Sequence, residues 1–238
     1  MNASAGKSSW SRWFTLVAFA VAMAWVESAV VYYLRTHLDR IEPHQANPLP
    51  LIGALGSVEL VRELATMIML LTTGSLAGRT WRERVGYTFL AFGVWDIFYY
   101  VFLKVMCGWP HSLLDWDILF LLPLPWWGPI LAPILIASQM IVWGTFASQV
   151  ETDPLPRVSN GCGWVLCFLG TVLALLAFMA DALRVARQGA DAIREVLPAE
   201  FNWWLFLVAL ALMTAPLVQE LWRHRPRQEA AIEGARTN

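Results

Sequence analysis

Four acidic residues lie inside long apolar stretches of the sequence: Glu27, Glu59, Glu63 and Asp96. A charge at the centre of a bilayer costs about 2.5–3.5 kcal/mol on insertion scales, so such residues face a bundle interior or a wet cavity. Carboxyl groups in such places act as general acids and bases or bind ions. We therefore predict that these four residues are the catalytic groups of an intramembrane site.

The second apolar stretch carries several polar residues at helical spacing. Glu59, Arg62, Glu63 and Thr66 follow one another at i, i+3, i+4 and i+7, which places them on one face of a helix. An E-x-x-x-E pattern is common on solvated helices, but here it lies within an apolar run. The pattern predicts that both glutamates point into a shared polar pocket.

The third apolar stretch carries a similar stripe, made of Asp96, Tyr99, Tyr100 and Lys104. We expect the two stripes and Glu27 to pack together, so that three helices share one pocket. Cations and hydroxyl groups beside the acids suit a substrate with an anionic or polar end. The residues predicted to bind the substrate are Arg62, Tyr99, Tyr100 and Lys104.

The charges in this expected pocket do not balance. Four carboxylates and two cations, Arg62 and Lys104, give a formal sum of −2. A low-dielectric pocket favours protonation of some acids or the binding of a cation. Glu27, alone on its helix, is the expected protonated donor. If a metal binds, the oxygen ligands Glu59, Glu63 and Asp96 suit a divalent cation such as Mg²⁺. Alternatively, the ion pairs only fix the packing of the helices.

The composition places the chain in a membrane. Of its 238 residues, 58% are apolar and 15% are charged, and the mean hydropathy is +0.51. Soluble domains are less apolar and carry more charge, and three cysteines do not make a disulfide framework. No basic stripe is present to neutralise phosphates, so nucleic acid is not an expected partner. The expected partners are membrane lipids.

Six apolar runs are long enough to cross a bilayer. We predict an all-α bundle of six transmembrane helices in one domain, residues 1–222, followed by a charged cytoplasmic tail, residues 223–238. The spans are at about 14–34, 53–76, 85–106, 127–147, 163–182 and 201–221. Between the third and fourth spans, the apolar run at 118–124 is too short to cross, and it is predicted to be interfacial or re-entrant.

Loop charges predict the orientation in a cell (inner) membrane. With both termini in the cytoplasm, ten loop lysines and arginines lie inside and five lie outside. The intramembrane charges then share the outer half of the bundle, which predicts a pocket that opens outward. The first run also has features of a signal peptide cleaved near Ala24. The apolar stretch, interrupted by Glu27, continues for ten residues past Ala24, which favours a retained helix.

These patterns favour an enzyme that acts on a lipid or isoprenoid-like substrate by acid/base or divalent-cation chemistry. Small membrane enzymes that act on isoprenoids also use lone intramembrane acids, and the parallel is one of analogy. A proton- or cation-coupled carrier is the first alternative, although the inverted repeats common in carriers are absent from the sequence. A non-catalytic assembly or scaffold subunit is the second alternative.

Overall fold

The computed structural model describes residues 3–45, 54–149, 161–189, 192–193, 196–215 and 217–219. Within these ranges the chain is mostly helical. It forms two compact units. The first contains residues up to Glu151 together with Phe178–Phe201, and the second contains Thr152–Ala177 and Asn202–Asn238.

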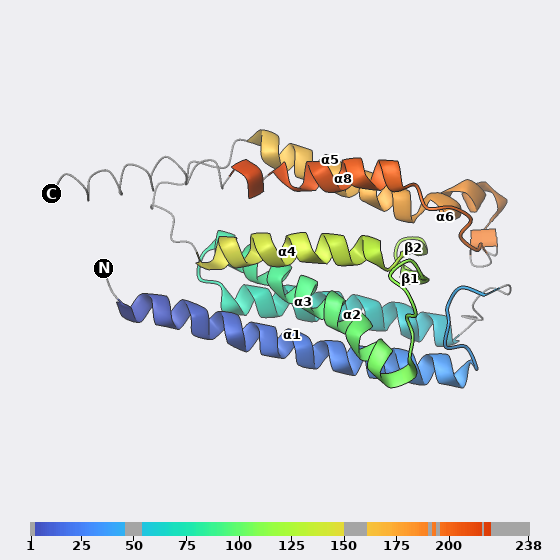
Figure 1. Cartoon of the computed structure of the whole chain (residues 1–238), viewed down its shortest axis with the longest axis horizontal. Helices are drawn as coiled ribbons and strands as arrows, with labels where there is room; N and C mark the ends of the chain where they lie inside the picture. The colour runs from blue at the N-terminus through green and yellow to red at the C-terminus, as the bar shows by residue number, and fades with distance from the viewer. Residues whose placement is uncertain are drawn as a thin grey trace. The chain divides into compact units, whose positions relative to one another are not determined.

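The first unit is a bundle of four long helices (Figure 1). They are α1 (Ala3–His37), α2 (Ala54–Ala77), α3 (Trp81–Cys107) and α4 (Leu131–Gln149). Helix α3 packs against the other three and is the central helix of the unit. The shortest of the four, α4, has 19 residues, which at about 1.5 Å per residue nearly matches the hydrocarbon thickness of a bilayer.

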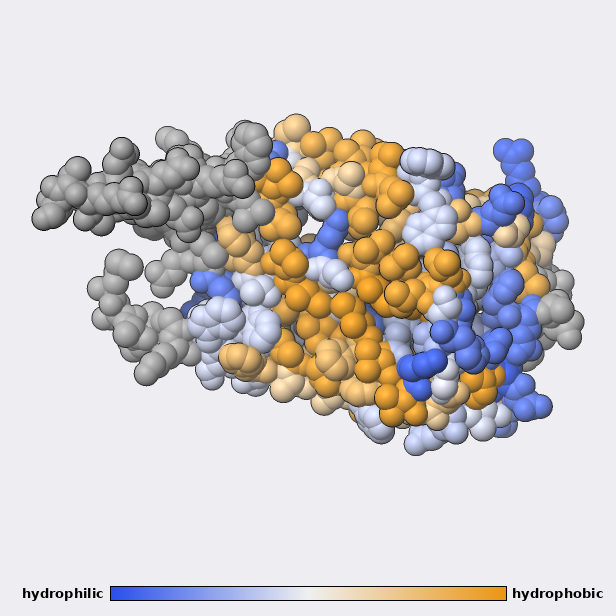
Figure 2. Space-filling model, viewed as in Figure 1, coloured by the Kyte–Doolittle hydropathy of each residue, from blue (hydrophilic) through white to orange (hydrophobic). Residues whose placement is uncertain are grey.

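The outer faces of these helices are apolar. Helix α2, for example, exposes Val58, Val61, Leu64, Ile68 and Leu71. Figure 2 shows the same character as an orange zone over the middle of the helices, with hydrophilic residues gathered beyond it. Apolar surface on this scale marks contact with lipid or another protein. Four described helices are long and apolar enough to cross a membrane, or five if one bent pair is a single span, so the chain is a multi-pass α-helical membrane protein.

Small residues bring α3 and α4 close together. A Cβ atom added at Gly93 would lie 2.5 Å from the Ala137 carbonyl oxygen, and one added at Gly144 would lie 2.5 Å from the Gly86 carbonyl oxygen. Close backbone approach at small residues is a common way for helices to associate in membranes. These glycines therefore hold α4 against the helix that carries Asp96.

A β-hairpin connects α3 to α4. Its strands are β1 (Trp116–Phe120) and β2 (Trp126–Pro129), and they pair antiparallel with Asp117 opposite Gly128. The all-α prediction missed these strands, and the fourth span begins at Leu131 rather than near residue 127. Large apolar and aromatic residues such as Trp116, Ile118 and Phe120 favour strands, and the prolines at 123 and 125 prevent a helix. An interfacial or re-entrant position for this segment stays a prediction.

The second unit contains most of α5 (Gly161–Phe178) and α8 (Trp203–Met213). Gly170 of α5 lies against the Ala209 carbonyl of α8. Helix α5 is followed by α6 (Ala180–Val185) and the 3₁₀ turn η1 (Ala186–Gln188), and together they form the bent pair. The predicted sixth span is not confirmed, because α8 has 11 residues within the described ranges. The predicted tail, residues 223–238, lies outside the described residues.

Candidate functional site

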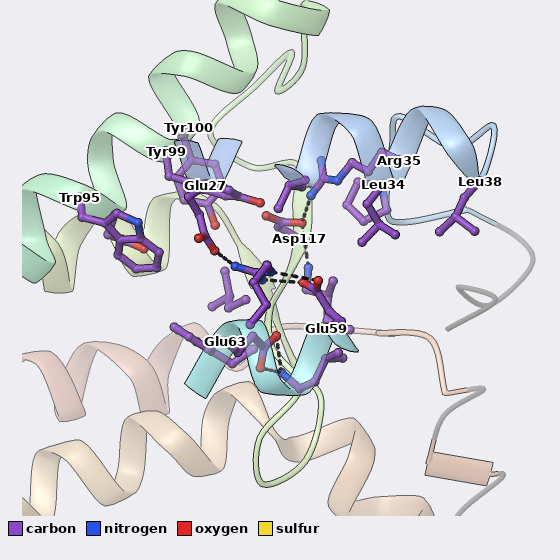
Figure 3. A pocket seen from close by; sticks show the side chains of 18 residues that line it. Glu27, Leu34, Arg35, Leu38, Glu59, Glu63, Trp95, Tyr99, Tyr100 and Asp117 are labelled. Atoms are coloured by element: carbon purple, nitrogen blue, oxygen red, sulfur yellow. Dashed lines mark hydrogen bonds and ion pairs between the residues drawn. The ribbon is translucent and has the colours of Figure 1, made fainter. Parts of the chain in front are cut away.

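A cavity lies in the first unit, next to strand β1 of the hairpin (Figure 3). It lies between the second half of α1, the first half of α2, the second half of α3, and strand β1. The charged residues that line it are Glu27, Arg35, Glu59, Arg62, Glu63, Asp96 and Asp117. Tyr99 and Tyr100 line it as well. The four predicted acids therefore lie around one chamber, while their chemical roles stay predictions.

Arg62 links two of the predicted acids. Its Nε donates to Glu59 Oε2 at 2.9 Å, its Nη2 pairs with the other oxygen of Glu59, and its Nη1 pairs with Glu27. The Thr66 hydroxyl donates to Glu27 at 3.1 Å. Figure 3 shows Glu27 from α1 and Glu59 from α2 directed toward the same region, with dashed lines for these ion pairs. The cluster therefore ties α1 to α2.

Glu63 binds the chain just after β1. Both of its carboxylate oxygens accept a hydrogen bond from the Leu121 backbone N–H, at 3.1 and 3.0 Å. Glu63 is buried, so this carboxylate is held by a backbone dipole instead of a cation. The contact connects α2 to the hairpin segment and places Leu121 on the cavity wall.

A second ion pair, which the sequence analysis missed, joins α1 to β1. Arg35 Nη2 donates to Asp117 Oδ1 at 2.8 Å, and the two residues are only 6% and 1% exposed. Arg35 also donates to the Ile41 carbonyl and lies 4.3 Å over the Trp109 ring. Burial raises the pKa of Asp117, while the charge of Arg35 and the Ile118 N–H oppose that rise.

Both members of this pair carried a signal in the sequence. Arg35 lies eight residues after Glu27, which places both on one helical face once the first helix is extended beyond residue 34. Counting Arg35 as a loop charge hid that relation. Asp117 lies between Trp116 and Ile118, two large apolar residues. It is the one buried residue of strand β1, and its carboxylate there contacts the guanidinium group of Arg35.

Asp96 differs from the other carboxylates of the cavity. It is 9% exposed and lines the cavity from α3. Within the described part of the chain, it has no hydrogen bond and no ion pair, whereas Glu27, Glu59, Glu63 and Asp117 each have at least one. The aromatic residues beside it in the sequence and one turn later, Trp95, Tyr99 and Tyr100, also line the cavity. Asp96 is therefore the carboxylate that remains available to a ligand.

Lys104 does not reach the cavity, contrary to the expectation that it joins this site. Its ammonium group donates to the carbonyls of Gly108 and Pro110 at 2.8 and 2.7 Å. The residue lies in the last turn of α3, where unpaired helix carbonyls attract a cation. Lys104 therefore stabilises the end of the helix and adds no charge to the cavity lining.

The charge of the cavity is more negative than the sequence suggested. Five carboxylates and two guanidinium groups line it, a formal sum of −3 if all are ionised. Both guanidinium groups, Arg35 and Arg62, are engaged by carboxylates. We predicted that Arg62 and Lys104 bind a substrate anion. Among the described residues that line this cavity, however, both guanidinium groups already lie in ion pairs, so none is left for an anion.

The carboxylates predicted to bind a metal, Glu59, Glu63 and Asp96, are not arranged as a metal site. Across the residues that the structure describes, no group of three or more His, Cys, Asp or Glu side chains is arranged to hold a metal ion. Glu59 is engaged by Arg62, and Glu63 is engaged by the Leu121 amide. The predicted set of Glu59, Glu63 and Asp96 consequently offers only Asp96 as an uncommitted carboxylate.

No family model matches the chain, and no curated protein or solved structure shows significant similarity to it. The chemistry of the cavity is therefore the basis for the functional argument.

Proposed function

We propose that the protein is a membrane-embedded enzyme that acts on a lipid or isoprenoid-like substrate through proton transfer at Asp96. The observation that carries the proposal is the difference between Asp96 and the other cavity carboxylates. Within the described chain it is the one cavity carboxylate that lacks an ion pair or a hydrogen bond. A general acid or base must reach the proton it transfers, so an uncommitted carboxylate is the best candidate.

The walls of the cavity support a substrate with an apolar part. Val31 and Leu34 line it from α1, Leu38 lines it just after that helix ends, and Ile118 and Leu119 line it from β1. A chamber lined by both apolar and charged residues suits a molecule with a hydrocarbon chain and a polar end. Access from the bilayer is part of this proposal, since the helices that form the cavity have apolar outer faces.

The remaining charged residues have a positioning role in this proposal. The pairs that link Arg62 to Glu27 and Glu59 hold α1 against α2, and Glu63 holds the segment after β1. These contacts fix the cavity walls around Asp96. The proposal also keeps the predicted orientation, in which both termini face the cytoplasm of an inner membrane and the cavity opens outward beneath an interfacial hairpin.

The test compares wild-type protein with Asp96→Asn in nanodiscs that contain a total lipid extract. Mass spectrometry follows which lipid species the wild-type protein consumes. We expect Asp96→Asn to lower that turnover by about 10²–10⁴-fold, the usual contribution of a general acid or base. The matched control is Glu42→Gln, which neutralises a carboxylate that is 53% exposed and does not line the cavity. Undiminished turnover in Asp96→Asn contradicts the proposal, as does the absence of any consumed lipid.

A carrier for protons or cations is the second candidate, and the formal charge of −3 in the cavity favours it. Its prediction is ion flux into proteoliposomes, lost in both Asp96→Asn and Glu63→Gln. An enzyme without transport activity gives no flux in either the wild-type protein or the variants. Flux without any consumed lipid would therefore replace the enzyme proposal with the carrier.

A further inference from the structure

We infer that the cavity binds an organic ammonium group, carried by a lipid headgroup or by a small amine. This inference rests on the proposed function for the identity of the substrate, but ammonium binding is measurable without turnover. It starts from Asp96, a carboxylate 9% exposed at the cavity wall with no partner among the described residues. A buried carboxylate without a partner is costly unless a ligand or a proton neutralises it.

The charge of the cavity selects the sign of the ligand. Carboxylates outnumber guanidinium groups by five to two, and both guanidinium groups already lie in ion pairs. An anion in this space meets more negative charge and finds no uncommitted cation among the described lining residues. A cation lowers the repulsion between Asp96 and the neighbouring Asp117. A cationic ligand therefore fits the cavity better than a phosphate.

Aromatic rings select the kind of cation. Trp95, Tyr99, Tyr100 and Phe120 all line the cavity. The ring centroids of Trp95 and Tyr99 lie 6.3 Å apart, and those of Tyr99 and Tyr100 lie 5.0 Å apart. Aromatic faces attract ammonium groups through cation–π interactions, and aromatic cages are the usual sites for quaternary ammonium ligands. A bare metal ion needs several oxygen ligands instead, and the described residues do not assemble such a set.

The position of Asp96 among these rings completes the argument. Trp95 precedes it directly, and Tyr99 and Tyr100 follow three and four residues later, one helical turn away. One stretch of α3 therefore supplies both a carboxylate for the charge and aromatic surface for its organic substituents. The apolar residues Val31 and Leu34 on α1 complete the lining for an attached carbon chain.

The experiment measures the binding of choline and ethanolamine to the full-length protein in phosphatidylglycerol nanodiscs by isothermal titration calorimetry. The neutral analogue 3,3-dimethylbutan-1-ol has the shape of choline without its charge. We expect at least one of the two amines to bind about tenfold or more tightly than the neutral analogue, consistent with a cation–π contribution added to a charge pair. Equal or tighter binding of the neutral analogue, or binding of inorganic phosphate with no binding of either amine, overturns the inference.

Variants link the binding to the proposed residues. Asp96→Asn should weaken amine binding by about tenfold or more and leave the neutral analogue unchanged, whereas Asp96→Glu should retain amine binding. Tyr99→Leu should weaken it as well, and Glu42→Gln should not. Size-exclusion profiles show that each variant is folded. If Asp96→Asn is folded and binds the amine as tightly as the wild-type protein, the inference is wrong.

The source of the ammonium group is resolved by changing the lipid. If the ligand is a headgroup, nanodiscs of phosphatidylcholine or phosphatidylethanolamine should compete with the added amine, and if it is a small amine they should not. Failure of this inference is distinct from failure of the proposed function. Lipid turnover that depends on Asp96 without amine binding overturns only the ammonium inference. Amine binding without any lipid turnover overturns only the enzyme.

Discussion

At the scale of single residues, the buried ion pair of Arg35 and Asp117 should be sensitive to the loss of either member. Both side chains are buried, and their contact at 2.8 Å joins α1 to β1. Removing one member of a buried pair leaves an uncompensated charge, which costs about 3–5 kcal/mol. Asp117→Asn and Arg35→Met should each lower the free energy of unfolding by about that amount. Unfolding in mixed micelles with increasing SDS measures it.

The double variant tests whether the cost comes from the stranded charge. Asp117→Asn combined with Arg35→Met should be less destabilised than the sum of the two single variants, because neither charge is then left alone. Part of the loss remains, since Arg35 also contacts the Ile41 carbonyl and the Trp109 ring. Strictly additive losses would show that the two residues stabilise the protein independently.

The acids of the site could be predicted from the sequence because a charged residue in an apolar span must face the bundle interior or a wet cavity. Glu27, Glu59, Glu63 and Asp96 were located by that argument, and helical spacing added Arg62, Tyr99 and Tyr100. Spacing also suggested Lys104, which lies two turns beyond Asp96, where the helix ends. The direction of its side chain depends on the carbonyls of Gly108 and Pro110, a local feature that spacing does not contain.

At the scale of elements, the carboxylate of Glu63 holds the segment that follows β1 against α2. Glu63 accepts the Leu121 N–H with both oxygens, so Glu63→Gln replaces a charge-assisted hydrogen bond with a weaker neutral one. We expect faster hydrogen exchange of the Leu121 amide in Glu63→Gln, with little change in the middle of α3. Hydrogen exchange followed by mass spectrometry on peptides around residue 121 makes this measurement. Unchanged protection there would mean that strand pairing alone holds the segment.

The contact between α3 and α4 gives a second prediction at this scale. A side chain at Gly93 meets the Ala137 carbonyl at 2.5 Å, so Gly93→Leu should separate the two helices. Overpacking of this kind costs about 1–3 kcal/mol, and more where the obstacle is backbone. Val105→Leu on the exposed face of the same helix is the matched control and should unfold like the wild-type protein. The same SDS titration compares them, and equal stability of the two variants would contradict the packing argument.

The helices and the hairpin differ in how far the sequence predicted them. The first predicted span lies inside α1, and the second and third begin and end within a few residues of α2 and α3. These helices were predictable because a long apolar run in lipid must satisfy its backbone hydrogen bonds within the helix itself. The hairpin depends on pairing between residues on either side of a proline-containing turn, as in Asp117 opposite Gly128. Such a pairing leaves no periodicity of 3.6 residues, and its apolar side chains resemble those of a helix.

At the scale of the whole molecule, the number of crossings decides which side of the membrane each segment faces. Within the described ranges four helices are long and apolar enough to cross, and α5 with α6 is a fifth if the bent pair is one span. Even numbers of crossings leave both termini on one side, and an odd number leaves them on opposite sides. The prediction that both termini are cytoplasmic therefore requires an even number of crossings. That number is four, or it is six if α5 with α6 is the fifth crossing and α8 is part of the sixth.

Reporter fusions distinguish these topologies. Alkaline phosphatase is active outside the cytoplasm, and green fluorescent protein fluoresces inside it, so each is fused after residues 42, 79, 113, 189 and 238. The excess of lysine and arginine on the inner loops predicts outside positions at 42 and 113 and an inside position at 79. An outside position at residue 113 also places the cavity on the outer side, since β1 follows directly and lines it.

The fusion after residue 189 is the decisive one. An outside position there, with an inside position at residue 238, requires both α5–α6 and the last helix to cross, which gives the six predicted spans. An inside position at both residues gives four spans, and an outside position at both gives five. Arg184 and Arg187, near the end of α6 and in η1, oppose the outside position, because positive charges resist translocation. Replacing both with glutamine should therefore leave a six-span topology unchanged, whereas a four-span protein should move residue 189 outward in part of the population.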